Sequence, residues 1–91
     1  MSETRALRLK TDGDFHRLGD EITVEVRDER GVPVAGAVVR FPDGGTVVTD
    51  ADGTATVVAD TTGILRLRAT RENEDGVSYA PDEHLVRVEE A

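Results

Sequence analysis

The chain has 91 residues, a length that accommodates one domain over residues 1–91 and leaves no room for a second core. It contains no cysteine and no tryptophan, which excludes a disulfide, a thiolate metal site and the disulfide-pinned core of antibody domains. Nineteen acidic residues against eleven basic ones give a formal charge of −8. This charge argues against binding to nucleic acid or to anionic membrane surfaces, because both need clustered Lys and Arg.

The basic residues are ten arginines and a single lysine, Lys10. An acidic, lysine-poor chain is typical of proteins from salt-loving or GC-rich organisms, so halophilic adaptation and codon bias both remain open. No stretch approaches the roughly 18 apolar residues of a membrane helix, and the first residues lack the apolar segment of a secretory signal. We therefore expect no membrane insertion, and either use without general export or origin within a longer exported protein.

Apolar and polar residues alternate with a period of two, which predicts half-buried strands. The pattern is clearest in Glu21–Asp28, where Ile22, Val24 and Val26 share one face. Turn signals recur roughly every ten residues, and no segment has the 3.6-residue period of a helix. The expected strands, in chain order, are Thr4–Lys10, Glu21–Asp28, Ala37–Phe41, Thr46–Thr49, Thr54–Ala59, Ile64–Thr70 and Glu83–Glu89.

The segments between these strands are expected to be turns and loops. Asp50–Gly53 is a tight hairpin signal in which the glycine takes a left-handed conformation. Residues 11–20 are expected to form an inter-strand loop, and residues 71–82 are the longest irregular stretch. Together the pattern predicts an all-β fold, a Greek-key β-sandwich of about seven antiparallel strands.

Four segments resemble the bacterial and archaeal Ig-like domains found in tandem on surface proteins, the invasin-like group included. They are residues 19–26, 31–41, 49–55 and 65–69. The chain is equally similar to the carboxypeptidase regulatory, transthyretin-like modules, which share the Gly-x-Pro-x-x-Gly-Ala and Thr-Asp-x-x-Gly elements found here at residues 31–37 and 49–53. The resemblance implies an Ig-like sandwich with adhesion, spacing or docking roles and no shared catalytic site.

Two acidic clusters are weak candidates for a metal site. Asp50 and Asp52 precede Gly53, but the segment lacks the third oxygen ligand and the terminal glutamate of an EF-hand loop. The alternative is a hairpin whose aspartates bind turn amides. Asp12 and Asp14 form the second cluster, for which the alternative is a solvated loop.

The sequence offers no catalytic constellation. His16 and His84 are the only imidazoles and lie far apart in the sequence, and neither serine lies in a nucleophile motif. We therefore expect a non-enzyme without a cofactor.

Seven residues are candidates for an interface with a protein partner or with further copies of the chain. Arg40, Arg66 and Arg68 fall on outward faces of expected strands and could contact an acidic partner, or could simply form a solvated charged face. Four apolar residues lie opposite the core rows of their strands, namely Val38, Val58, Ile64 and Leu85. On a single face they would form an apolar patch of the kind that marks interfaces, whereas a register slip would bury them.

Three functional hypotheses follow. The first is a virion protein that decorates a capsid or associates with a tail, and so lies on the virion surface. The second is one repeat of a cell-surface or S-layer-like adhesin, acting as a spacer or adhesion domain. The third is a carbohydrate- or calcium-binding module, for which Tyr79 is the one aromatic residue considered as a sugar platform.

Overall fold

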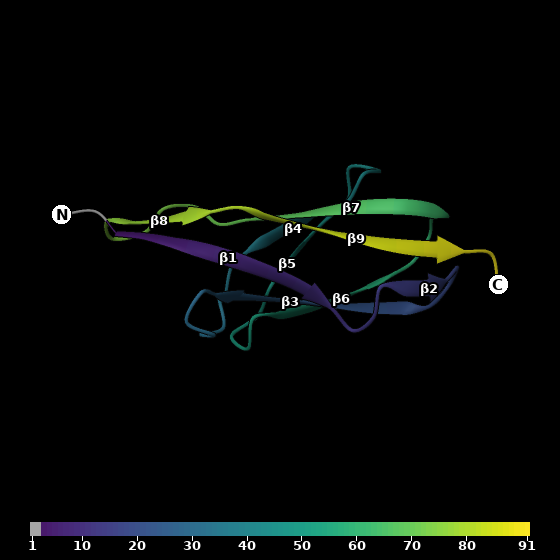
Figure 1. Ribbon diagram of the computed structural model, residues 1–91, viewed down its shortest axis with the longest axis horizontal. Helices are drawn as coiled ribbons and strands as arrows, with labels where there is room; N and C mark the ends of the chain where they lie inside the picture. Colours follow the sequence, from purple (N-terminus) through teal and green to yellow (C-terminus); the bar gives the residue numbers. More distant parts are fainter. Residues whose placement is uncertain (1–2) are drawn as a thin grey trace.

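The computed structural model describes residues 3–91, and every regular element in that range is a β-strand (Figure 1). No helix in the described part of the chain is long and apolar enough to cross a membrane. The all-β expectation is therefore confirmed. The nine strands are β1 (Glu3–Thr11), β2 (Phe15–Arg17), β3 (Glu21–Asp28), β4 (Val38–Arg40), β5 (Thr46–Val48), β6 (Thr54–Val58), β7 (Gly63–Thr70), β8 (Val77–Ala80) and β9 (Asp82–Glu89).

The strands form two sheets, and the aliphatic side chains lie between them. The four-stranded sheet has the order β6-β3-β1-β8, and the five-stranded sheet has the order β2-β9-β7-β4-β5. In Figure 1, β7 lies along the upper side of the molecule and β3 and β6 along the lower side, with β1 and β9 between them. The domain is elongated, measuring 50 × 21 × 17 Å.

The core consists of aliphatic side chains, as the scarcity of aromatic residues requires. Ile22, Val24 and Val26 of β3 are fully buried, as are Leu67 and Ala69 of β7, so the alternation predicted for both strands is confirmed. The rest of the core is Leu7, Leu9, Val34, Ala37, Val39, Ala59, Leu65, Val86 and Val88. This alternation fixes the register of each strand, because a slip of one residue would turn its buried row towards solvent.

Two short strands, β2 and β8, fall in segments that the sequence predicts to be loops. Each pairs in parallel with a long strand about 70 residues away in sequence: β2 with β9, and β8 with β1. The structure thus corrects the expected seven antiparallel strands in two respects, since there are nine strands and two of the pairings are parallel. Strands of three and four residues are too short to show alternation, and their partners are too distant for a local signal.

Two buried polar side chains close turns at the edge of the core. The Asp28 carboxylate accepts hydrogen bonds from the backbone N–H of Arg30 (2.9 Å) and Val32 (3.0 Å), and it pairs with Arg5 at 3.2 Å. The Thr49 hydroxyl donates to the carbonyl of Val34 (2.7 Å) and accepts from the N–H of Ala37 (2.9 Å). Within residues 3–91, no buried side-chain nitrogen or oxygen lacks a hydrogen-bond partner, so these polar groups are buried without the cost of unsatisfied bonds.

The turn at Asp50–Gly53 connects β5 and β6, which lie in different sheets, so the hairpin expected there is wrong. Gly53 of this turn packs directly against the backbone of β3. Its carbonyl accepts a hydrogen bond of 2.8 Å from the N–H of Val26, and its φ angle is +75°. A Cβ atom at this position would lie 2.6 Å from the Val26 carbonyl oxygen and 3.1 Å from Pro33. Only glycine allows both the left-handed conformation and this approach.

We predict that Gly53→Ala destabilises the domain by about 3 kcal/mol or more, because it adds a backbone clash to the cost of a left-handed alanine. Gly31→Ala is the matched control, since Gly31 has a φ of +82° but no atom within 4 Å of the place that a Cβ would occupy. That variant should lose only about 1–2 kcal/mol. Urea unfolding of both variants tests this, and equal losses would show that the close approach at Gly53 contributes nothing.

Candidate functional site

The outer face of the five-stranded sheet carries most of the residues considered for an interface. In the strand register, Arg40 of β4 lies opposite Arg68 of β7. Farther along β7, Arg66 lies opposite Leu85 of β9, and Ile64 lies opposite Arg87. Ile64 and Leu85 are 63% and 53% exposed, so both remain on the surface rather than entering the core. We call this surface the docking face.

Val58 does not lie on the docking face. It belongs to β6 in the other sheet, opposite Glu21, and its side chain is 59% exposed there. Val38 does lie on the docking face, but its side chain is partly covered. It lies beside Val48, near the end of β7 that is farthest from Ile64. The four apolar residues therefore do not form one patch. Alternation places a residue on the outer side of its own strand but does not say which sheet the strand joins.

Phe15 takes a place that the sequence could not assign. It lies in β2 opposite Arg87 of β9, with its side chain 52% exposed. Because Arg87 also lies opposite Ile64, and Leu85 is two residues away on the same strand, Phe15, Ile64 and Leu85 surround Arg87. We call these three residues the apolar cluster. Phe15 alternates with His16, which is buried, but three residues are too few for this alternation to be recognised in the sequence.

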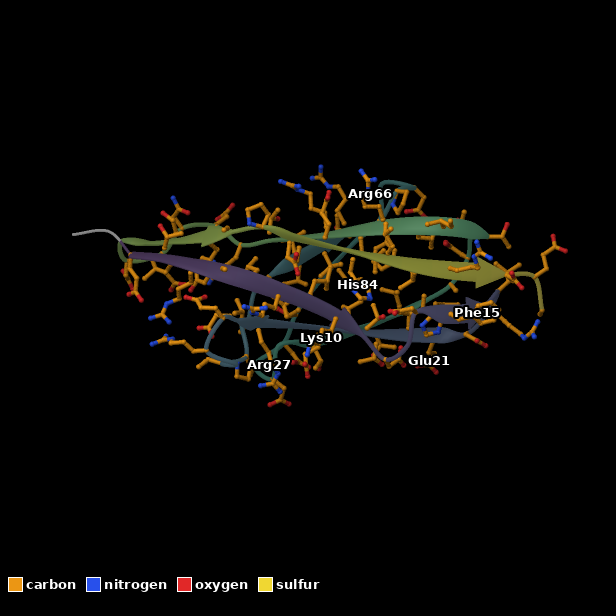
Figure 2. All side chains as sticks on the ribbon, in the orientation of Figure 1. Lys10, Phe15, Glu21, Arg27, Arg66 and His84 are labelled. Atoms are coloured by element: carbon orange, nitrogen blue, oxygen red, sulfur yellow. The ribbon has the colours of Figure 1, made fainter. Side chains whose placement is uncertain are left out.

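The docking face is basic although the chain is acidic. It carries five arginines, at positions 17, 40, 66, 68 and 87, against two glutamates, at positions 83 and 89, whereas the whole chain has a net charge of −8. Arg66 projects from the upper side of the molecule in Figure 2, away from Glu21 and Arg27 on the opposite side. Most of the acidic residues lie elsewhere, mainly in turns, and the excess of arginine over glutamate on this face favours contact with anionic groups.

The arginines of the docking face differ in how they are paired. Arg68 approaches Glu83 at 3.4 Å, Arg87 approaches Glu89 at 3.8 Å, and Arg17 lies 6.0 Å from the centre of the Phe15 ring. Over residues 3–91, neither Arg40 nor Arg66 has a side-chain hydrogen bond or an ion pair. These two guanidinium groups are therefore available to a partner.

The two histidines hold the loop between β1 and β2. His16 Nε2 lies 2.7 Å from the carbonyl of Gly13 and 3.5 Å from a carboxylate oxygen of Asp12. His84 Nε2 lies 2.7 Å from a carboxylate oxygen of Asp14. The fold thus places two imidazoles that are 68 positions apart in sequence against the same loop, and the contact of His84 fastens this loop to β9. In the part of the chain that the structure covers, no group of three or more His, Asp or Glu side chains is arranged to hold a metal ion.

The Asp50 carboxylate caps its own turn, which connects β5 of one sheet to β6 of the other. It accepts hydrogen bonds from the backbone N–H of Thr54 (3.1 Å) and Asp52 (2.9 Å), and also from the Thr54 hydroxyl. These bonds, with the Thr54 amide first, hold the pKa of the Asp50 carboxyl below its ordinary value of 3.8. The Asp52 carboxylate is exposed and makes none of these contacts. This arrangement matches the expected alternative in which aspartate binds turn amides.

Tyr79 is poorly placed to serve as a sugar platform. Its side chain is half-buried against the core, and the guanidinium of Arg71 lies 5.7 Å from the centre of its ring. Arg71 is itself held by the carbonyl of Ala35 at 2.9 Å and by Glu74. One face of the ring is therefore occupied by a cation that is fixed in place.

No protein-family model matches the chain, and no curated protein is significantly similar to it in sequence.

We predict that Asp50→Asn lowers the thermal midpoint at neutral pH, because a neutral amide replaces a charged hydrogen-bond acceptor. The folded pKa of Asp50 lies below 3.8, so its ionised form stabilises the fold above about pH 3.8, and this contribution is lost as the pH falls through the folded pKa. The difference from the wild type should therefore shrink as the solution is acidified.

Asp52→Asn is the control, and it should leave the midpoint unchanged because the Asp52 carboxylate bonds no turn amide. Calorimetric scans from neutral pH to about pH 3 measure both variants. A difference for Asp50→Asn that stays constant with pH would contradict the capping role.

Proposed function

We propose that this chain is a non-catalytic interaction module, an Ig-like sandwich that attaches to a larger protein assembly through its docking face. The proposal has two parts. The first concerns the finer topology of the fold, and the second concerns the face that makes the contact.

The Ig-like topology is supported by the pairing of the long strands. In the immunoglobulin arrangement, strands A, B and E share one sheet and strands C, F and G share the other. Here β1, β3 and β6 pair consecutively in one sheet, and β4, β7 and β9 pair consecutively in the other. In chain order these strands correspond to A, B, E and C, F, G, which is the Greek-key order. Strand β5 beside β4 corresponds to the extra strand C′, and β8 is an addition between F and G.

The observation that carries the docking proposal is the composition of the docking face. Buried interface centres are enriched in aromatic residues and arginine and depleted of lysine. This face combines Phe15, Ile64 and Leu85 with five of the ten arginines, while the only lysine, Lys10, lies on the other sheet. Each residue of the apolar cluster is more than half exposed, so the cluster stabilises the isolated domain little.

The larger assembly that we favour is a virus particle, and a cell-surface protein array is the alternative. Both present repeated protein surfaces that a small, rigid sheet can contact. The carbohydrate alternative is less well supported because Arg71 covers one face of Tyr79. The calcium alternative is less well supported because turn amides already occupy the Asp50 carboxylate.

Site-specific photo-crosslinking in the cells that make the protein tests the docking face. A benzophenone amino acid at position 64 or 85 should give an adduct of one defined mass. The same probe at position 58 should give only background, although Val58 is as exposed as Ile64 (59% and 63%). Equal adducts from positions 58 and 64, or none from either 64 or 85, would contradict the proposal.

A charge substitution then tests whether the contact depends on the apolar cluster. Ile64→Glu should reduce the adduct formed from position 85 by about tenfold, as expected for a residue central to an interface. Val58→Glu adds the same charge to the other sheet and should leave that adduct unchanged.

A further inference from the structure

Three arginines on the docking face surround a shallow groove at the junction of β4 and β7. Arg40 and Arg68 are register partners on adjacent strands, and Arg66 lies two residues from Arg68 on the same side of β7. The Cα atoms of Arg40 and Arg66 are therefore each only about 5–7 Å from the Cα atom of Arg68. The groove is lined by these three residues together with Phe41, Pro42, Gly44 and Glu83, and its volume is about 360 Å³.

The charges in this groove are incompletely balanced within the domain. Like charges directly opposite each other on neighbouring strands repel, so the Arg40–Arg68 pair is unfavourable for the isolated sheet. Glu83 is the one acidic residue that lines the groove, and it contacts Arg68 at 3.4 Å. Arg40 and Arg66 have no such contact within the described residues, which leaves two guanidinium groups unpaired beside a third.

The other sheet contains a useful contrast. Arg8 of β1 and Arg27 of β3 are also register partners on an outer face. There, however, Arg27 pairs with Glu25 at 3.0 Å and donates to the carbonyl of Gly31 at 2.7 Å. Opposed arginines alone therefore do not make a site. The distinctive features at β4 and β7 are the third arginine, the missing counter-charges and the groove.

We propose that the groove formed by Arg40, Arg66 and Arg68 binds an acidic segment of a protein partner, with at least two side-chain carboxylates held by the guanidinium groups. This inference rests on the proposed docking function and names the chemistry of the partner. The planar guanidinium group matches a carboxylate in a two-pronged hydrogen-bonded arrangement, which lysine cannot reproduce.

The surroundings of the groove favour a short acidic peptide over a long polyanion. Phe41 and Pro42 form one wall, so a polypeptide can bring an apolar side chain beside its carboxylates. Asp43 and Asp60 lie just beyond that wall, where they line an adjoining hollow. A nucleic acid strand carries a charge at every nucleotide and would extend past the groove into these carboxylates, whereas a short peptide can place uncharged residues there.

A titration with octaglutamate, followed by NMR of the isotope-labelled full chain, tests the groove. The side-chain Nε–H signals of Arg40 and Arg66 and the backbone amides of residues 40, 41 and 43–45 should shift saturably. Octaglutamine, which matches the peptide in length but lacks charge, should cause no shift. Raising the salt concentration should weaken the binding, because the site is open to solvent.

Substitutions identify the residues responsible. Arg40→Gln and Arg66→Gln should each weaken octaglutamate binding by about five- to tenfold, and the lysine variants should recover only part of it. Arg40→Gln also removes a like-charge pair, so its thermal midpoint should equal or exceed that of the wild type. Arg8→Gln removes one charge from the other sheet and should leave the binding unchanged.

Three results would overturn the proposal: shifts at Arg8 and Lys10 as large as those at Arg66, equal losses from Arg8→Gln and Arg66→Gln, or binding of tripolyphosphate without binding of octaglutamate. The last result would identify a phosphate site instead. If octaglutamate fails while positions 64 and 85 still crosslink, the docking face stands and the acidic partner is wrong. If octaglutamate binds while crosslinking fails, the groove is an anion site and the docking function is wrong.

Discussion

The burial of one side of β7 is the constraint on which the rest of the molecule depends. Leu65, Leu67 and Ala69 enter the core between the two sheets, so the alternate residues must face solvent. β7 also lies between β9 and β4, and its register therefore determines which residues of those two strands lie beside its outward arginines. A slip of one residue would bury two charges and expose the core, which makes the docking face a direct consequence of the packing beneath it.

Much of the fold could be predicted because most of its strands are long enough to alternate. The pattern in Glu21–Asp28 matches the observed ends of β3, and the buried valines of β3 and β9 occupy the positions that the pattern requires. β2 and β8 escape prediction because three or four residues carry no period, and only their pairing with distant strands orders them. Local sequence likewise does not say that β6 joins the opposite sheet from β7, so alternation alone cannot separate Val58 from Ile64.

The candidate site was predictable in its members and not in its arrangement. Arg40, Arg66 and Arg68 could be placed on outward faces from alternation alone. Their convergence depends on the pairing of β4 with β7, a contact between residues 28 positions apart in the case of Arg40 and Arg68. The contribution of Phe15 depends on the unpredicted β2. Sequence thus identified the chemistry of single side chains, and tertiary pairing decided which of them act together.

The two parallel pairings have a mechanical consequence. β1 and β8 begin near one end of the long axis, and β9 ends near the other (Figure 1). Tension applied at Glu3 and Ala91 would draw β2 and β9 in opposite directions along their length, because the two strands run parallel and are loaded at opposite ends. The hydrogen bonds between them would then bear the load together in shear instead of opening one after another. This geometry raises the barrier to forced unfolding, a property governed by the unfolding rate rather than by the equilibrium stability of a small aliphatic core.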